Sequence, residues 1–217
     1  MRWFHLTVLG MALVGPAQSE DIIDVLRRSQ QQRLESLVTA PDGERAQAVR
    51  ATFEKLVQAL HIDVPTELRV VSSGSYAETL HGNIVIASES LADLPEGERS
   101  FIMAHELGHV VSGHWAQMGR VYQRWVPGAV TQDKTDPVAG LLGRDASGLA
   151  HRHEYAADVF ALQALAKLGW PADVAFSAFM RQGMQFDTAT HPGTRKRIGS
   201  LRAVQAGVTS PSAEEAE

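Results

Sequence analysis

No cysteine occurs in this chain. Without thiols it can form neither a disulfide nor the lipidated cysteine of a lipoprotein anchor, so packing and any bound metal must hold the fold together. After residue 20 the sequence also has no stretch near the roughly 20 apolar residues that a membrane span requires. Lys and Arg number 20 against 25 Asp and Glu, and no basic stripe with interleaved aromatics is visible. We therefore expect no nucleic-acid partner.

The first residues have the features of an export signal. Arg2 provides a short positive region, Leu6 to Val14 is almost entirely apolar, and small residues around Ala17 and Ser19 follow at cleavage-site spacing. We predict a signal peptide over 1–19; an uncleaved signal anchor is the alternative, so association with a membrane remains open.

The length fits one domain, which we expect over 20–206, followed by an acidic, disordered tail over 207–217.

The most informative motif is His105-Glu106-Leu107-Gly108-His109, an HExxH sequence. Histidines four apart lie on one helical face, where both can reach one metal ion, and the carboxylate between them projects beside that ion. The turn and acidic residues before Phe101 favour a helix here. The motif predicts two zinc ligands and a general base, Glu106, although such a pentapeptide also arises by accident.

Catalytic zinc needs three protein ligands and an open position for water, so the chain must supply a third donor. Glu154 is the candidate, on a predicted second helix that also carries Asp158 on the same face. Asp158 would orient a ligating histidine through its free ring N–H. A solvated acidic edge is the alternative interpretation of this pair.

A third motif, beginning at His191-Pro192, completes a pattern. The chain carries three motifs in this order: HExxH, then Glu154 to Asp158 (ExxxD), then His191 to Arg197 (HPxxxxR). Together they resemble the zinc metallopeptidases of the HtpX and CAAX prenyl protease type. The resemblance runs from about Leu68 to Leu201.

The resemblance implies one Zn²⁺ per chain, bound by His105, His109 and Glu154, with Glu106 as base. It also places His191 and Arg197 beside the reacting carbonyl. There His191 would either stabilise the oxyanion or inhibit by binding zinc. Tyr155 is a weaker candidate for the oxyanion.

These residues imply a zinc-dependent metalloendopeptidase, a hydrolase of peptide bonds. The chain resembles the small secreted bacterial branch of the family, which implies a periplasmic protease whose substrates are misfolded envelope polypeptides. A zinc-containing chaperone or binding module that does not cut is the alternative function, and a protease specific for one regulatory partner is another.

The pattern of apolar residues predicts an α+β fold, mostly helical, of the gluzincin type that the resemblance implies. Its small sheet or hairpin would place an edge strand beside the zinc helix. The predicted strands are 68–72 and 83–87, with 83–87 as the edge strand or, equally, a buried core strand. The predicted helices outside the motifs are 21–38, 44–60, one from after Trp170-Pro171 to about 183, and a last one to about 205.

The segment 124–150 is rich in glycine and proline and lacks a convincing period, so we expect either a flap over the cleft or a disordered connector. Three further histidines lie near the motifs. We expect His114 on a helix surface, and His151 and His153 as capping or surface residues.

Overall fold

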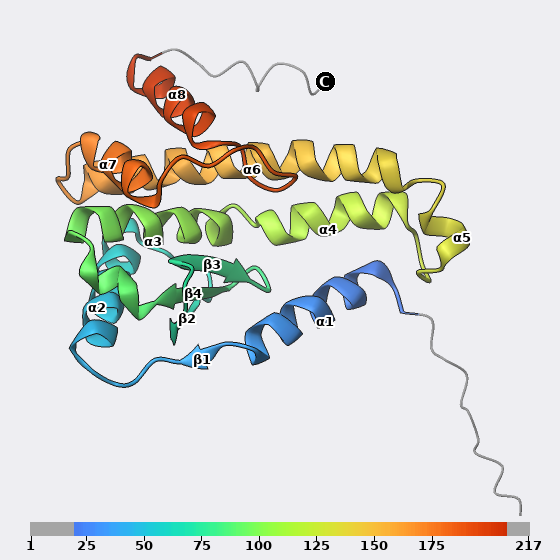
Figure 1. Cartoon of the computed structure of the whole chain (residues 1–217), viewed down its shortest axis with the longest axis horizontal. Helices are drawn as coiled ribbons and strands as arrows, with labels where there is room; N and C mark the ends of the chain where they lie inside the picture. Colours follow the sequence, from blue (N-terminus) through green and yellow to red (C-terminus); the bar gives the residue numbers. More distant parts are fainter. Residues whose placement is uncertain (1–19, 208–217) are drawn as a thin grey trace, which may run out of the picture.

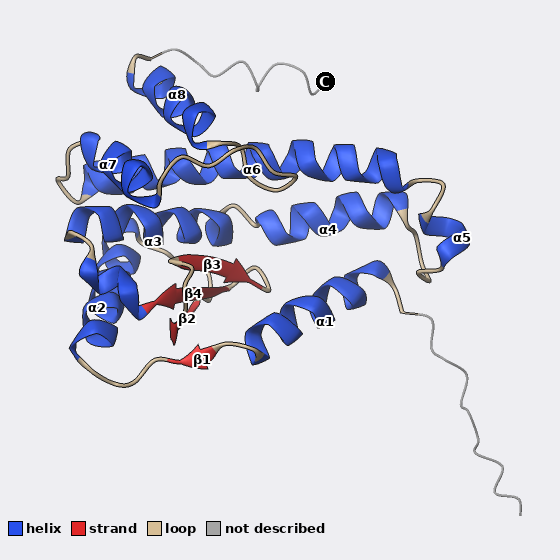
Figure 2. Ribbon diagram, viewed as in Figure 1, coloured by secondary structure: helices blue, strands red, loops and turns tan. Residues whose placement is uncertain are grey.

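The computed structural model describes residues 20–207 (Figure 1). The predicted signal peptide and positions 208–217 of the predicted tail lie outside the described residues. Helices surround one small sheet (Figure 2), as the α+β prediction expected. Among the described residues, no helix combines the length and apolar character needed to cross a membrane.

Two helices precede the sheet. Helix α1 (Ile22–Glu35) begins at Asp21, whose side chain accepts the otherwise unpaired backbone N–H groups of the first turn and so caps the helix. A short strand, β1 (Val38–Thr39), follows. Helix α2 (Glu44–Leu60) has the predicted bounds and ends at His61, which takes the left-handed conformation common at helix ends.

The sheet has the order β1-β2-β4-β3, with β2 (Glu67–Ser72), β3 (Ala77–Leu80) and β4 (Ile84–Ser88). Strand β4 pairs in parallel with β2 and antiparallel with β3, and all its residues are buried. The interpretation of 83–87 as an edge strand is therefore wrong. Its apolar run has no polar face to turn to solvent, which is typical of a central strand. The outer strand is β3.

Helix α3 (Glu96–Val111), which follows the short 3-10 helix η1 (Glu89–Asp93), carries the HExxH motif through the core. It packs along α6 (Ala139–Lys167), as Figure 1 shows. The two backbones come close at Gly108, where an added Cβ would lie 3.1 Å from the Cα of Ala157. Small residues at this crossing thus bring the motif of one helix next to that of the other.

The segment 124–150 is neither a flap nor disordered. It contains the end of α4 (His114–Trp125), the short α5 (Gln132–Thr135) and the first half of α6. Glycine lowers helix propensity by about 1 kcal/mol per residue, which obscures the helical pattern in the sequence. Packing of α4 against α6, including a hydrogen bond from the Trp125 indole to Asp145 at 3.0 Å, supplies the compensating stability.

The last two helices are α7 (Asp173–Gln182) and α8 (Thr194–Gln205), close to the predicted bounds. The loop between them returns over α6 and carries His191 (Figure 1). Hydrogen bonds tie this loop to the start of α8: Gly193 N–H donates to Asp187 at 2.6 Å, and Thr194 N–H donates to the carbonyl of Gln185 at 3.1 Å. The loop therefore holds His191 at a defined place.

Candidate metal centre and active-site cleft

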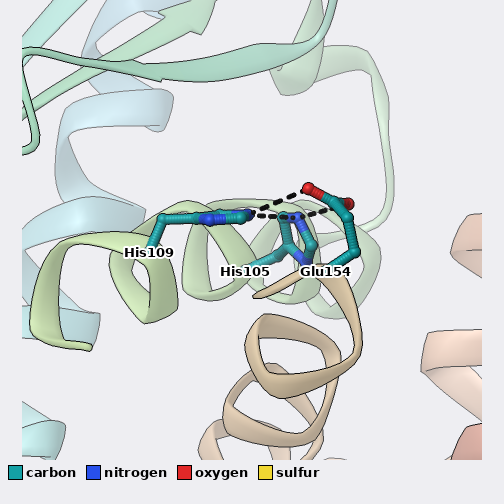
Figure 3. A group of neighbouring side chains, drawn as sticks. All are labelled: His105, His109 and Glu154. Carbon is teal, nitrogen blue, oxygen red and sulfur yellow. Dashed lines mark hydrogen bonds and ion pairs between the residues drawn. The ribbon is translucent and has the colours of Figure 1, made fainter. Parts of the chain in front are cut away.

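Three side chains from two helices meet at one point. His105 and His109 lie one turn apart on α3, and Glu154 approaches them from α6 (Figure 3). The two Nε2 atoms are 3.1 Å apart. Oε2 of Glu154 lies 3.4 Å from Nε2 of His105, and Oε1 lies 3.3 Å from Nε2 of His109. We call these residues the triad.

The spacing of the triad suits a tetrahedral metal. With Zn–N and Zn–O bonds of about 2.0 to 2.2 Å, two ligand atoms of a tetrahedron lie about 3.3 to 3.5 Å apart, close to the separations here. In addition, Glu154 Oε2 is buried, and among the described residues it has no hydrogen-bond partner. Two imidazole nitrogens and a carboxylate oxygen are also a donor set that zinc commonly accepts. The residues present therefore fit a zinc ion.

Asp158 sets the orientation of His105. Its fully buried carboxylate lies 3.0 Å from Nδ1 of His105. A ring that donates its Nδ1 proton there presents the lone pair of Nε2 to the triad, the arrangement that a metal ligand needs. The alternative interpretation of Asp158 and Glu154 as a solvated acidic edge is excluded, because both are buried.

The charges around His105 favour a cation. Burial disfavours its protonated form, but the neighbouring carboxylates of Asp158 and Glu154 outweigh burial and raise the pKa of His105 to about 10. Burial likewise acts against ionised Glu154, yet His105 and His109 hold the pKa of this carboxyl well below its usual range. Ionised, buried carboxylates that stabilise a positive charge on His105 also stabilise a metal ion at the same place.

Arg197 lies behind the ligands. Its Nε donates to Asp158 Oδ2 at 2.8 Å, its Nη1 is 3.4 Å from Glu154 Oε2, and its guanidinium stacks over Phe179 at 4.7 Å. The resemblance implied that Arg197 lies beside the reacting carbonyl; in the structure Arg197 contacts the carboxylates of Asp158 and Glu154 and also lines the larger cavity beside the triad. The sequence pattern brings Arg197 to the site, but its partner is Asp158.

His114 and His153 form a second layer that the sequence reasoning missed. Nδ1 of His114 lies 2.9 Å from Nδ1 of His109, and the His114 ring stacks on His153 with centroids 3.9 Å apart. Both rings are buried, and burial lowers the pKa of His114 to about 3 and of His153 to about 4. Their assignment to the surface is wrong. The turn at Gly113, in the left-handed region, starts a new helix and redirects His114.

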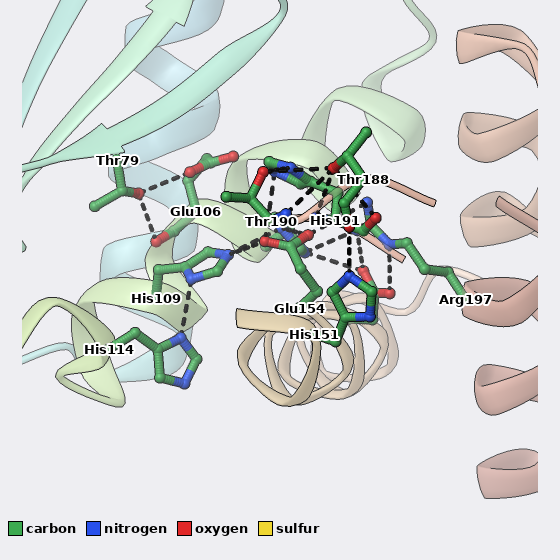
Figure 4. Close-up of polar contacts among 12 residues, drawn as sticks. Thr79, Glu106, His109, His114, His151, Glu154, Thr188, Thr190, His191 and Arg197 are labelled. Carbon is green, nitrogen blue, oxygen red and sulfur yellow. Dashed lines mark hydrogen bonds and ion pairs between the residues drawn. The ribbon is translucent and has the colours of Figure 1, made fainter. Parts of the chain in front are cut away.

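Glu106 lies on α3, beside the two histidines of the triad, and its carboxylate points to β3. The hydroxyl of Thr79 donates to Oε2 of Glu106 at 2.7 Å (Figure 4). A carboxylate next to the metal position is what the HExxH motif predicts for a general base.

Two adjoining cavities, of about 500 and 290 Å³, flank the triad. They share six lining residues: Ala77, Glu78, His105, Glu106, Glu154 and His191. The shared lining makes them one cleft that passes over the triad, and β3 forms one wall. The expected edge strand beside the zinc helix is therefore present, supplied by β3.

His191 lies on the opposite wall. Its side chain is 56% exposed, and Nε2 is 3.7 Å from Glu154 Oε1. The Thr190 hydroxyl lies 2.8 Å from its Nδ1 (Figure 4). His151, whose Nε2 donates to the carbonyl of Thr188 at 2.8 Å, supports the same loop. Tyr155 is absent from the lining of the cleft that the described residues form.

Comparisons with known proteins bear on the family of this chain. No curated protein matches the chain. Among solved structures, the crystal structure of Ste24p from S. mikatae matches 82% of this chain at 17% identity, with a TM-score of 0.46. The match covers 56% of that protein, so this chain corresponds to little more than half of its length. Residues 43–205 match the peptidase family M48. This range includes the triad as well as Glu106, Asp158 and Arg197. The chain therefore belongs to peptidase family M48, as its three ordered motifs predicted.

Proposed function

We propose that this protein is a zinc-dependent endopeptidase. The observation that carries the proposal is the triad with donor atoms at tetrahedral separations, next to a carboxylate in a cleft open to solvent. His105, His109 and Glu154 would hold one Zn²⁺, and Asp158 and His114 would orient the two imidazoles.

The chemistry follows from the positions of the side chains. A zinc ion at the triad supplies Lewis acidity, which makes a water molecule acidic near neutral pH and polarises a peptide carbonyl. Glu106 accepts the proton of the attacking water and passes it to the leaving amine. His191 donates from Nε2 to the developing oxyanion when the Thr190 hydroxyl donates to its Nδ1 and so keeps the proton on Nε2.

The cleft suits an extended polypeptide. Strand β3 pairs with β4 on one side only and forms the outer edge of the sheet. An extended segment can add to such an edge through backbone hydrogen bonds, which are independent of sequence. This mode of binding favours unfolded or flexible polypeptides, because a folded substrate has no free strand to offer.

We further propose that the protein is exported and acts in the periplasm, on misfolded envelope proteins. The support is the signal-like composition of 1–19 and the resemblance to secreted members of the family.

Casein cleavage by the purified mature protein, with and without a chelator, tests the proposal. We expect cleavage that the chelator stops and that Zn²⁺ restores. Glu106→Gln should keep zinc but lose about 10² to 10⁴-fold in rate, the usual contribution of a positioned acid-base group. Glu96→Gln, on the same helix but outside the cleft, is the matched control and should cleave normally.

Binding of casein without any cleavage by the zinc-loaded protein would instead favour the non-cleaving chaperone. Full activity in Glu106→Gln would assign the base to another residue.

A further inference from the structure

We propose that Thr79 is a positioning residue for Glu106, and that it fixes the carboxylate of the general base from the strand that forms the wall of the cleft. The inference rests on the proposed function, because it assigns to Thr79 a role that exists only if Glu106 is the base. Nothing in the HExxH pattern points to a residue on another element of the fold.

The contact is short and well defined. Thr79 Oγ1 lies 2.7 Å from Oε2 of Glu106 and 3.2 Å from the backbone carbonyl oxygen of Glu106 (Figure 4). A threonine hydroxyl has a single proton, and both neighbours only accept. The shorter distance and the negative charge direct that proton to the carboxylate.

This hydrogen bond restricts the rotation of the Glu106 side chain. Helix α3 fixes the backbone of Glu106, but the carboxylate sits at the end of a side chain with three rotatable bonds and faces a cleft of about 500 Å³. Holding Oε2 against Thr79 leaves Oε1 as the oxygen available to the attacking water. A base that is already in place when substrate binds does not lose rotamer freedom during the reaction.

The position of Thr79 in the sheet makes this hydrogen bond rigid. Thr79 is opposite Val85 in the pairing of β3 with the buried central strand β4. Successive side chains of a strand point to opposite faces, so Glu78 and Thr79 diverge, and Thr79 is the one that reaches α3. The general base is therefore tied to the same strand that we expect to receive the substrate.

Steady-state kinetics on a fluorescent peptide test the role. We expect Thr79→Val, which keeps the shape but not the donor, to lower kcat by about 10 to 100-fold, since a misplaced catalytic group can cost about 10²-fold. KM should stay within about twofold, because the variant does not change the binding interactions that the substrate and the transition state share. Thr79→Ser restores the hydroxyl and should recover most of kcat. Thr66→Val, a hydroxyl loss outside the cleft, is the control and should match the wild type.

Two further measurements separate positioning from a general structural effect. Zinc affinity by chelator competition should be the same in Thr79→Val and in the wild type, since the hydrogen bonds of the Thr79 hydroxyl among the described residues go to Glu106 and not to the triad. In the Glu106→Gln background, Thr79→Val should cause no additional loss, because a residue that acts only through Glu106 has nothing left to act on. Thr79→Ala repeats the series if Thr79→Val does not fold.

The inference is overturned by a wild-type kcat in Thr79→Val, by a Thr79→Ser variant as slow as Thr79→Val, or by an equal additional loss in the Glu106→Gln background. Failure of the proposed function is distinguishable, because it would show as no cleavage by the zinc-loaded wild type, whereas a different base would show as undiminished cleavage by Glu106→Gln.

Discussion

The Nδ1 atoms of His109 and His114 lie 2.9 Å apart, so one of these two imidazoles donates a proton to the other. If Nε2 of His109 binds a metal, its Nδ1 carries the proton and His114 accepts it. The two histidine ligands are then oriented by different partners: a carboxylate holds His105, whereas a neutral imidazole holds His109.

We predict that His114→Phe weakens zinc binding by about 10 to 100-fold, the usual cost of losing a partner of a ligand. Phenylalanine keeps a ring to stack on His153 but cannot accept the proton of His109. Chelator competition measures the affinity. His153→Phe is the matched control, because His153 stacks on the same ring and its hydrogen bond among the described residues is to Gln117 rather than to His109. An equal loss in both variants would assign the effect to packing.

Asp158→Ala should weaken zinc binding by about 10 to 100-fold and also lower stability. It leaves the largely buried Arg197 without its bidentate partner, and breaking a buried ion pair costs about 3 to 5 kcal/mol. Denaturant unfolding and chelator competition measure the two effects. Asp158→Ala combined with Arg197→Met should recover stability but not zinc affinity. Recovery of both would mean that Asp158 has no direct role in orienting His105.

The metal content itself is testable. We predict one zinc per chain in the purified mature protein and almost none in His109→Ala, because the remaining two donors cannot retain the ion. Elemental analysis decides the point. A wild-type protein that lacks zinc and does not take up added Zn²⁺ would contradict the assignment of the triad.

His191→Ala should lower kcat by about 10² to 10³-fold if the imidazole stabilises the oxyanion, as the loss of such a donor does in other hydrolases. If His191 instead swings onto the zinc and displaces water, its removal should increase the rate. Nε2 is 3.7 Å from Glu154 Oε1, which is near enough for either role. Kinetics on a fluorescent peptide distinguish the two, and an unchanged rate would exclude both.

The mature N-terminus is expected at Gln18 or Glu20, after cleavage of the exported chain. Mass spectrometry of the native protein from fractionated cells measures it. A cytoplasmic protein that starts at Met1 would contradict export and would favour the alternative of a regulatory protease.

Local patterns in the sequence were enough to predict the elements that carry the ligands. The bounds of α2 and the helical setting of His105 and His109 follow from residue periodicity, which acts within a few turns. The candidate third ligand, Glu154, followed from the need for a third donor and from the helical face that it shares with Asp158. Those inferences concern residue types and spacing along one chain, and such features are visible before folding.

Tertiary packing decided the rest. Strand β4 became central because β2 and β3 pair with its two edges, and 139–150 became helical because α4 lies alongside. The turn at Gly113 directs His114 into the site, and Arg197 donates a hydrogen bond to Asp158. Thr79 donates a hydrogen bond to Glu106, which is 27 residues away in the sequence. Contacts between distant segments leave no periodic signal in either segment, because the free energy that selects them arises only when the surfaces pack together.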